Sequence, residues 1–303
     1  MSALALPALA TSDGSPAATP PRRFRQTPLG RVGAILTMLL LVIVAILCLI
    51  PFWAIVVGTF QPGDMLMRNG VNLGIDFAQA SFKNYVMLFT DSGMYFRWFA
   101  NSLVLTVVQV VGTLLVSAFV AYGFAMYEFR FKTGLFILVL VILTIPFEML
   151  MLPLYIQVNK WHIGDNYLTV VLPFLASATT IFFFRQYLRG IPHDILEAGR
   201  IDGVTEFGIF FRLVLPLMKP AIAAMAILNG MTCWNNFLWP MLVLRSPEKY
   251  TLSIGLRTLL TPYGNNYSLL IIGAFFSLIP ILILFFAFQK FFIEGMTAGA
   301  VKG

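Results

Sequence analysis

Nine charged side chains lie between residues 185 and 219 of a chain that is 59% hydrophobic and only 11% charged. They are Arg185, Arg189, Asp194, Glu197, Arg200, Asp202, Glu206, Arg212 and Lys219. Carboxylates and guanidinium groups at this density form ion pairs and charge-assisted hydrogen bonds, with one another or with a second protein. The sequence shows no serine–histidine–aspartate order, no paired catalytic carboxylates and no metal-ligand spacing. Charge alone favours a solvated pair of helices at the membrane surface, with a protein-binding surface as the alternative, and the chain is not expected to be an enzyme.

The first half of this segment has the residues that start and stop a short helix. Asp194 is placed to be the N-cap, and Glu197, three residues later, gives the spacing of a capping box. Gly203 is expected to end the helix, because glycine adopts the left-handed conformation at little cost. We therefore predict a stiff helix that follows Pro192 and carries Glu197.

A second helical piece is predicted to follow at an angle to the first. Thr205 can cap it, and Pro216 stops or kinks the chain before the next apolar run. The two pieces then form a right-angled hairpin that its charges keep soluble. Apolar side chains are expected to give this hairpin a docking surface, and they are Ile201, Phe207, Phe210 and Phe211.

The rest of the chain supplies long apolar stretches, and its mean hydropathy is +0.87. A helix needs about 20 apolar residues to cross a bilayer, and runs without alternation favour helices over a β-barrel. Six runs qualify, at 32–58, 98–127, 133–158, 166–184, 220–244 and 258–289. The predicted fold class is an all-α membrane protein with six transmembrane helices and a cytoplasmic hairpin between helices 4 and 5.

The distribution of Lys and Arg predicts the orientation, because cytoplasmic loops carry an excess of positive charge. Thirteen of these residues lie on the side that holds both termini and segment 185–219, against seven on the other side. Both termini are therefore expected in the cytoplasm. The expected divisions are a disordered tail at 1–30, a first span at 31–58, an external segment at 59–97, a core at 98–290 and a tail at 291–303.

Polar side chains in the fifth run are candidates for a substrate pathway. Asn229, Thr232 and Asn236 are spaced to share one face of a helix, and Trp234 and Asn235 lie beside them. Amides exchange hydrogen bonds with sugar hydroxyls, and aromatic rings stack on the apolar face of a sugar. The alternative is that these groups hold neighbouring helices together, a common role of Asn and Thr in membranes.

Glu148 is the one formal charge inside an expected span. An acid at mid-membrane costs a few kcal/mol unless it faces a cavity or a partner. Pro146 and Pro153 flank it, so a kinked helix is expected. Three interpretations stay open: Glu148 lines a cavity, it is a neutral or paired structural acid, or it couples transport to protons.

Small polar residues also recur along the second run, and there we favour helix packing over pathway lining. They are Ser102, Thr106, Gln109, Thr113 and Ser117, with Gly112 beside them to allow close approach.

The spacing inside segment 185–219 resembles the EAA motif of the membrane subunits of ABC importers. That motif reads Glu-Ala-Ala, three residues, Gly, nine residues, Ile, one residue, Leu-Pro. The matching residues are Glu197, Ala198, Gly199, Gly203, Leu213, Leu215 and Pro216. Two positions depart in like character, since Gly199 stands where Ala is usual and Leu213 where Ile is usual.

Stretches 145–155, 235–240 and 297–303 are similar to the second permease subunit of the maltose/oligosaccharide type, although Glu148 stands where a neutral Gln is commoner. The resemblance implies a permease subunit of a binding-protein-dependent carbohydrate importer in a bacterial cytoplasmic membrane, working by alternating access. The helix with Glu197 would sit in a cleft of an ATP-hydrolysing subunit. Asp202, near the helix C-terminus where the dipole disfavours an acid, would also face a basic partner.

The partners that the resemblance implies are a second, related permease chain, two ATP-binding subunits and an extracytoplasmic solute-binding protein docked on the outer loops. The lipid bilayer surrounds the complex, and no nucleic acid is expected. The chain lacks the G-x-x-x-x-G-K-[S/T] sequence that cradles phosphates. ATP and Mg²⁺ are therefore expected in the partner ATPase, with no cofactor in this chain.

Three rival functions stay open. A proton-coupled secondary transporter would use Glu148, a scaffolding membrane protein would have no substrate, and a related ABC permease would carry glycerol-3-phosphate or another polar solute. The spacing from Glu197 to Pro216 separates the ABC interpretation from the first two rivals, which have no reason to contain it.

Overall fold

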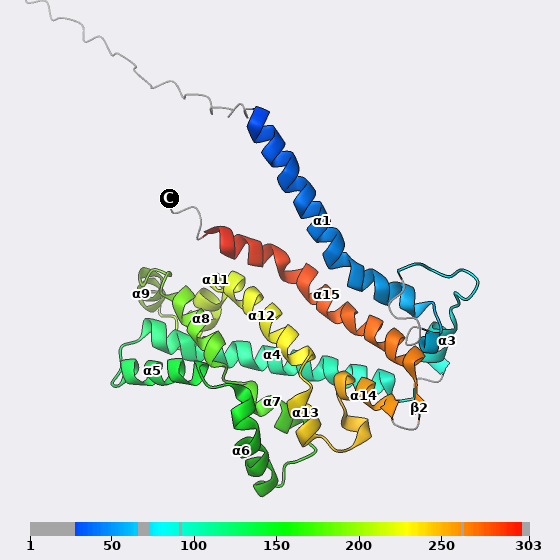
Figure 1. Ribbon diagram of the computed structural model, residues 1–303. Coiled ribbons are helices and arrows are strands. Elements are labelled where there is room, and N and C mark those ends of the chain that lie inside the picture. Colours follow the sequence, from blue (N-terminus) through cyan, green and yellow to red (C-terminus); the bar gives the residue numbers. More distant parts are fainter. Residues whose placement is uncertain (1–27, 66–72, 91–92, 262–263, 299–303) are drawn as a thin grey trace, which may run out of the picture. The chain divides into compact units, whose positions relative to one another are not determined.

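The computed structural model describes residues 28–65, 73–90, 93–261 and 264–298, and this part of the chain is almost entirely helical (Figure 1). It departs from the expected all-α class only in β1 (Leu260–Thr261) and β2 (Gly264–Asn265), a short antiparallel hairpin within those described ranges. The chain divides into two compact units, Met1–Pro51 and Phe52–Gly303.

One helix makes up the described part of the first unit and continues into the second. α1 (Pro28–Thr59) carries no charge from Val32 onward and contains Pro51. The expected first span at 31–58 falls within this helix. The expected tail at 1–30 lies, up to residue 27, outside the described residues.

A buried asparagine anchors the segment that follows α1. Asn84 belongs to α3 (Lys83–Thr90), and its Nδ2 donates to the carbonyls of Thr59 at 3.0 Å and Gln61 at 2.8 Å. α4 (Tyr95–Met126) then begins inside the segment expected to be external, 59–97. The second span therefore starts a few residues earlier than its apolar run.

The expected third and fourth spans are each bent. α5 (Lys132–Leu143) and α6 (Phe147–Lys160) meet at 101°. Pro146 has no N–H and disfavours helical geometry at the residue before it, so the single kinked helix predicted at 133–158 is wrong. The fourth run consists of α7 (Tyr167–Val171), η1 (Leu172–Phe174) and α8 (Ala178–Leu188), with a bend of 43°.

The fifth and sixth runs also differ from continuous helices. α12 (Lys219–Trp234) and α13 (Leu238–Val243) are separate, so the chain leaves helical geometry at 235–237. After η3 (Pro247–Lys249) and α14 (Leu252–Thr258), the β-hairpin occupies the start of the predicted sixth run. α15 (Tyr267–Ala298) starts later than predicted and continues through the expected tail as far as Ala298; residues 299–303 lie outside the described residues.

α4 is the central helix of the second unit. It packs against α8, α12 and α14, and α12 also lies along α15 (Figure 1). Thr113 donates from Oγ1 to the Phe174 carbonyl at 2.8 Å, and Ser102 accepts from the Leu252 amide at 2.8 Å. The packing role predicted for the polar residues of this helix is therefore confirmed for Ser102 and Thr113.

Three described helices are long and apolar enough to cross a membrane, namely α1, α4 and α15. The number rises to six if each of three bent helix pairs is one span. The predicted count of six crossings therefore requires that each bent pair acts as one crossing. These pairs are α5 with α6, α7 and η1 with α8, and the helical segment Glu206–Leu217 with α12.

Candidate functional site

The first arm of the charged segment is α9 (Asp194–Ile201). His193 is its N-cap and makes no side-chain capping bond, so the prediction of Asp194 as the N-cap is wrong. Asp194 and Glu197 instead lie in the first turn, where the helix dipole favours negative charge. Glu197 and Ala198 are exposed to solvent, so an acidic helix end is available to a partner.

Gly203 forms the elbow after this arm, as the sequence predicts. Its φ is +73°, in the left-handed region that glycine adopts readily. The Gly203 amide donates to the Arg200 carbonyl at 3.0 Å, and the Val204 amide to the Gly199 carbonyl at 2.9 Å. These two bonds are the Schellman arrangement, which satisfies the carbonyls at the helix end and fixes the direction in which the chain leaves it. Asp202, directly before the elbow, is exposed.

The second arm consists of α10 (Glu206–Gly208), the π-helical turn η2 (Ile209–Val214) and α11 (Leu215–Leu217). The Thr205 hydroxyl accepts from the Gly208 amide at 3.2 Å, which confirms the predicted cap. Leu215 and Pro216 lie directly before the junction with α12, where the axis turns by 77°. Pro216 lies inside α11 and does not end it, and the bend expected at the entry to the fifth span follows two residues later, at Met218.

The two arms pack closely at Gly199, which is buried. A Cβ at this position would lie 2.9 Å from Leu213 Cδ1 and 3.1 Å from Ile209 Cγ1. Such contacts are too short, so glycine lets the second arm approach the first.

Glu206 joins the elbow to the end of α4. Arg200 donates from Nε to Glu206 Oε1 at 2.7 Å, and the Tyr127 hydroxyl donates to Glu206 Oε2. The Tyr122 and Tyr127 hydroxyls are 3.4 Å apart. The hydrogen bond from Arg200, followed by that from Tyr127, lowers the pKa of the Glu206 carboxyl. Sequence reasoning missed this role, because Tyr127 is far from Glu206 along the chain.

Aromatic side chains of the second arm also rest on α4. Phe207 stacks on Phe119 with ring centroids 5.9 Å apart, and Phe210 meets the same ring edge-on at 5.4 Å. Phe210 is only 1% exposed, so its predicted place in the docking surface is wrong. Ile201, Phe207 and Phe211 do remain exposed.

The candidate pathway residues of the fifth run separate into two groups. Asn229 donates to Thr180 Oγ1 on α8 at 3.1 Å, and the Trp234 indole donates to the Ser277 carbonyl on α15 at 3.1 Å. These two side chains tie helices together. Thr232 and Asn235 are exposed and bond carbonyls of their own helix. Asn236 is half-buried beyond the end of α12 and lines a small cavity.

Glu148 lies in the first turn of α6 rather than in the middle of a continuous helix. The helix dipole favours a carboxylate there. Its side chain is exposed, beside the 101° bend.

An ion pair missed by sequence reasoning connects two loops beyond α6 and α13. Asp165 accepts from the Arg245 amide at 2.9 Å, the Ser246 hydroxyl at 2.6 Å and Lys249 Nζ at 2.9 Å. Burial raises the pKa of the Asp165 carboxyl, but the hydrogen bonds from Ser246, Arg245 and Lys249 outweigh it and hold the pKa well below its usual range.

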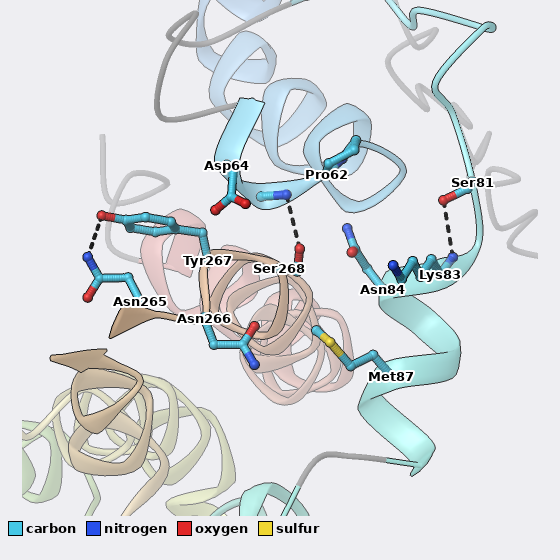
Figure 2. Close-up of a pocket in the computed structure, with 11 residues that line it drawn as sticks. Pro62, Asp64, Ser81, Lys83, Asn84, Met87, Asn265, Asn266, Tyr267 and Ser268 are labelled. Atoms are coloured by element: carbon cyan, nitrogen blue, oxygen red, sulfur yellow. Dashed lines mark hydrogen bonds between the residues drawn. The ribbon is translucent and has the colours of Figure 1, made fainter. Parts of the chain in front are cut away.

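A pocket of about 560 Å³ lies between residues 62–64, α3 and the start of α15 (Figure 2). Asp64, Asn266 and Met87 come from these three different walls (Figure 2). Ser268 Oγ accepts from the Gly63 amide at 3.0 Å. A Cβ at Gly63 would lie 2.3 Å from the Ser268 nitrogen, so this approach needs glycine. The sequence shows no local signal for the pocket because its walls are distant in the chain.

Comparison with known proteins places these features in context. Residues 113–297 match the protein family described as "Binding-protein-dependent transport system inner membrane component". The arabinooligosaccharides transport system permease protein AraQ of Bacillus subtilis (strain 168) is 48% identical, over 92% of this chain and 99% of that protein. The lactose transport system permease protein LacG of Rhizobium radiobacter is 32% identical, over 90% of this chain and 97% of that protein.

A solved structure has the same fold. It is a crystal structure of a bacterial ABC transporter involved in the import of the acidic polysaccharide alginate, and the matching chain superimposes with a TM-score of 0.76 at 23% identity. The match covers 88% of this chain and 98% of that chain.

Proposed function

Because this chain belongs to the family of binding-protein-dependent transport system inner membrane components, we propose that it is the permease subunit of an ATP-driven importer of oligosaccharides. It is a multi-pass membrane protein and a transport component, not an enzyme. The exposed acidic arm of segment 185–219 supports the coupling part of the proposal. Glu197 and Asp202 are exposed on this arm, and two backbone hydrogen bonds fix the elbow that follows it.

In the proposed coupling loop, the residues have two kinds of role. Glu197, Ala198 and Asp202 form the surface that contacts the ATPase, since all three are exposed. The remaining motif residues shape the hairpin: Gly199 and Leu213 set the distance between the arms, Gly203 forms the elbow, and Leu215 and Pro216 precede the turn into α12. A short capped helix is stiff, so it transmits a rigid-body displacement to the helices behind it.

The proposed complex contains a second, related permease chain, two ATP-binding subunits and an extracytoplasmic solute-binding protein. Both termini and the coupling loop face the cytoplasm, and the chain crosses the membrane six times. ATP and Mg²⁺ are bound by the ATPase subunits. The solute-binding protein docks on the outer segments, which include the pocket beside α3.

Arabinooligosaccharides are the proposed substrate class, because the relative with 48% identity is named for their transport. Thr232, Asn235 and Asn236 are the proposed pathway residues, since each keeps an exposed or half-buried side chain. Asn229 and Trp234 are assigned to helix packing by their hydrogen bonds to α8 and α15.

The proposal is tested by assembling the complex in proteoliposomes and measuring ATP-dependent uptake of a labelled arabinotriose. Glu197→Lys is expected to abolish co-purification of the ATPase or to uncouple hydrolysis from uptake, because it reverses the charge at the docking surface. Glu128→Lys is the matched control, since Glu128 is 90% exposed and pairs with Lys132 four residues away. Normal coupling by Glu197→Lys, or uptake that survives without ATPase and collapses with an uncoupler, would refute the proposal.

A further inference from the structure

A small cavity with both polar and apolar walls lies where α12 ends and α13 begins. Its polar lining residues are Ser102, Thr106, Gln109, Asn236 and Thr251, and the others are Leu105, Val170, Cys233 and Pro240. Its volume is about 10 Å³, on the order of what one water molecule needs. Neither Asp nor Glu is among its lining residues, so nothing in the wall would neutralise a cation.

Two buried polar atoms in this wall have no hydrogen-bond partner among the described residues. They are Gln109 Oε1 and Thr251 Oγ1, and each residue is only 6% exposed. An unmet buried hydrogen bond costs about 1–3 kcal/mol. A space of this size, lined by two residues that carry such atoms, is where a buried water is expected.

The same cavity adjoins the interruption of the fifth run. α12 ends at Trp234 and α13 begins at Leu238, and Asn236 between them contributes its side chain to the wall. In an apolar surrounding, broken helices keep their freed backbone groups satisfied by side chains and ordered waters. The polar wall beside this break is therefore what hydration of the break would require.

We propose that the cavity holds one buried water that bridges Gln109 and Thr251 and hydrates the break between α12 and α13. Thr251 is the N-cap of α14 and Gln109 belongs to α4, so the bridge joins two elements that are distant in sequence. A water at this point lets α13 pivot against α12 without exposing an unmet hydrogen bond. The pivot rests on the proposed transport function, whereas the water site does not.

A double-mutant cycle on the full-length chain, purified with its partner subunits, tests the bridge without measuring transport. Gln109→Leu and Thr251→Val are each expected to lower the melting temperature, because each leaves the water and the other side chain with an unmet bond. In the double variant both sides are apolar and the water is gone, so its shift should be smaller than the sum of the two single shifts by roughly 2 °C or more. Thr251→Ser loses only the γ-methyl group and keeps the hydroxyl, so it should lower the melting temperature less than Thr251→Val.

Gln109→Leu combined with Ser117→Ala is the matched control. Ser117 Oγ is also buried and has no hydrogen-bond partner within the described ranges, but Ser117 does not line the cavity, so these two shifts should add. A density map of the assembled transporter that resolves waters should show one peak in the cavity. Additive shifts for Gln109 and Thr251, or an empty cavity in such a map, would overturn the proposal even if sugar uptake proceeds as proposed.

Discussion

Gly199 and Leu213 are the two positions at which the proposed coupling loop departs from the EAA pattern, and they face each other across the hairpin. A methyl group on residue 199 would lie 2.9 Å from Leu213 Cδ1. The space that the missing Cβ leaves is therefore filled by a terminal methyl of the leucine. We infer that the two departures form one compensated change, which neither residue type reveals when it is considered alone.

Gly199→Ala is expected to lower the stability of the full-length protein by about 1 kcal/mol. Overpacking costs about 1–3 kcal/mol, and the higher helix propensity of alanine offsets about 1 kcal/mol of that. Adding Leu213→Ile moves the branch point toward the backbone, so the double variant should recover the loss. Melting temperatures of the four proteins measure the coupling.

The control for this cycle is Gly123→Ala, because Gly123 is also helical but a Cβ there would meet nothing within 4 Å. It should raise the melting temperature. A Gly199→Ala variant that is stabilised as much as Gly123→Ala would show that the arms are not in close contact.

At the scale of elements, the second arm of the hairpin is held against α4 by side-chain contacts. Phe207 and Phe210 rest on Phe119, and the Glu206 carboxylate joins Arg200 to Tyr127 at the end of that helix. Exposed ion pairs of this kind contribute little to global stability, typically up to about 1 kcal/mol. Their effect is expected in how the hairpin moves, because they tie it to a long helix that crosses the core of the second unit.

Tyr127→Phe and Glu206→Gln are each expected to lower substrate-stimulated ATP hydrolysis several-fold while changing the melting temperature little. Both variants weaken the same contact between Tyr127 and Glu206, so the double variant should lose no more activity than the more strongly impaired single variant. Hydrolysis and uptake are measured together in proteoliposomes, with Glu128→Gln as a control on a neighbouring exposed pair. Multiplicative losses in the double variant would argue against one shared link.

The sequence predicts local features of this loop better than its packing. The glycine elbow at Gly203 and the Thr205 cap follow from intrinsic preferences of those residues, and both are present. Asp194 was expected to be the N-cap, but the helix starts one residue earlier than that role requires. The burial of Phe210 and the contact of Tyr127 with Glu206 depend on where α4 lies, which no local pattern encodes.

Apolar composition similarly locates the membrane runs but not their shape. Pro146 signals a kink, whereas the angle of 101° depends on how α5 and α6 pack. The break at 235–237 lies four residues before Pro240, which has no N–H for the Asn236 carbonyl and whose ring would clash with it in a continuous helix. The outer pocket beside α3 combines three distant segments, so only the fold brings its residues together.

For the whole molecule, the charge bias predicts which side of the membrane each loop faces. Ile201 is 85% exposed in the proposed coupling loop, and Phe77 is 87% exposed in the segment after α1. The proposed orientation places Ile201 in the cytoplasm and Phe77 outside.

Cysteine labelling in right-side-out vesicles tests this orientation, in a background in which Cys48 and Cys233 are replaced by Ala. A membrane-impermeant maleimide should label Phe77→Cys directly and Ile201→Cys only after the vesicles are opened. Preserved uptake shows that each variant is folded. Labelling of Ile201→Cys in closed vesicles would invert the predicted topology and remove the contact between the loop and a cytoplasmic ATPase.

The elbow at Gly203 has a stereochemical consequence. Its φ is +73°, yet a Cβ built there would meet nothing within 4 Å. Residue 203 is thus constrained by handedness and not by volume: an L-alanine strains the backbone, whereas a D-alanine, whose mirror-image preference matches this φ, would fit the open space. Chemical synthesis of the loop with L-alanine or D-alanine at position 203 would show whether this position requires a positive φ or a residue without a side chain.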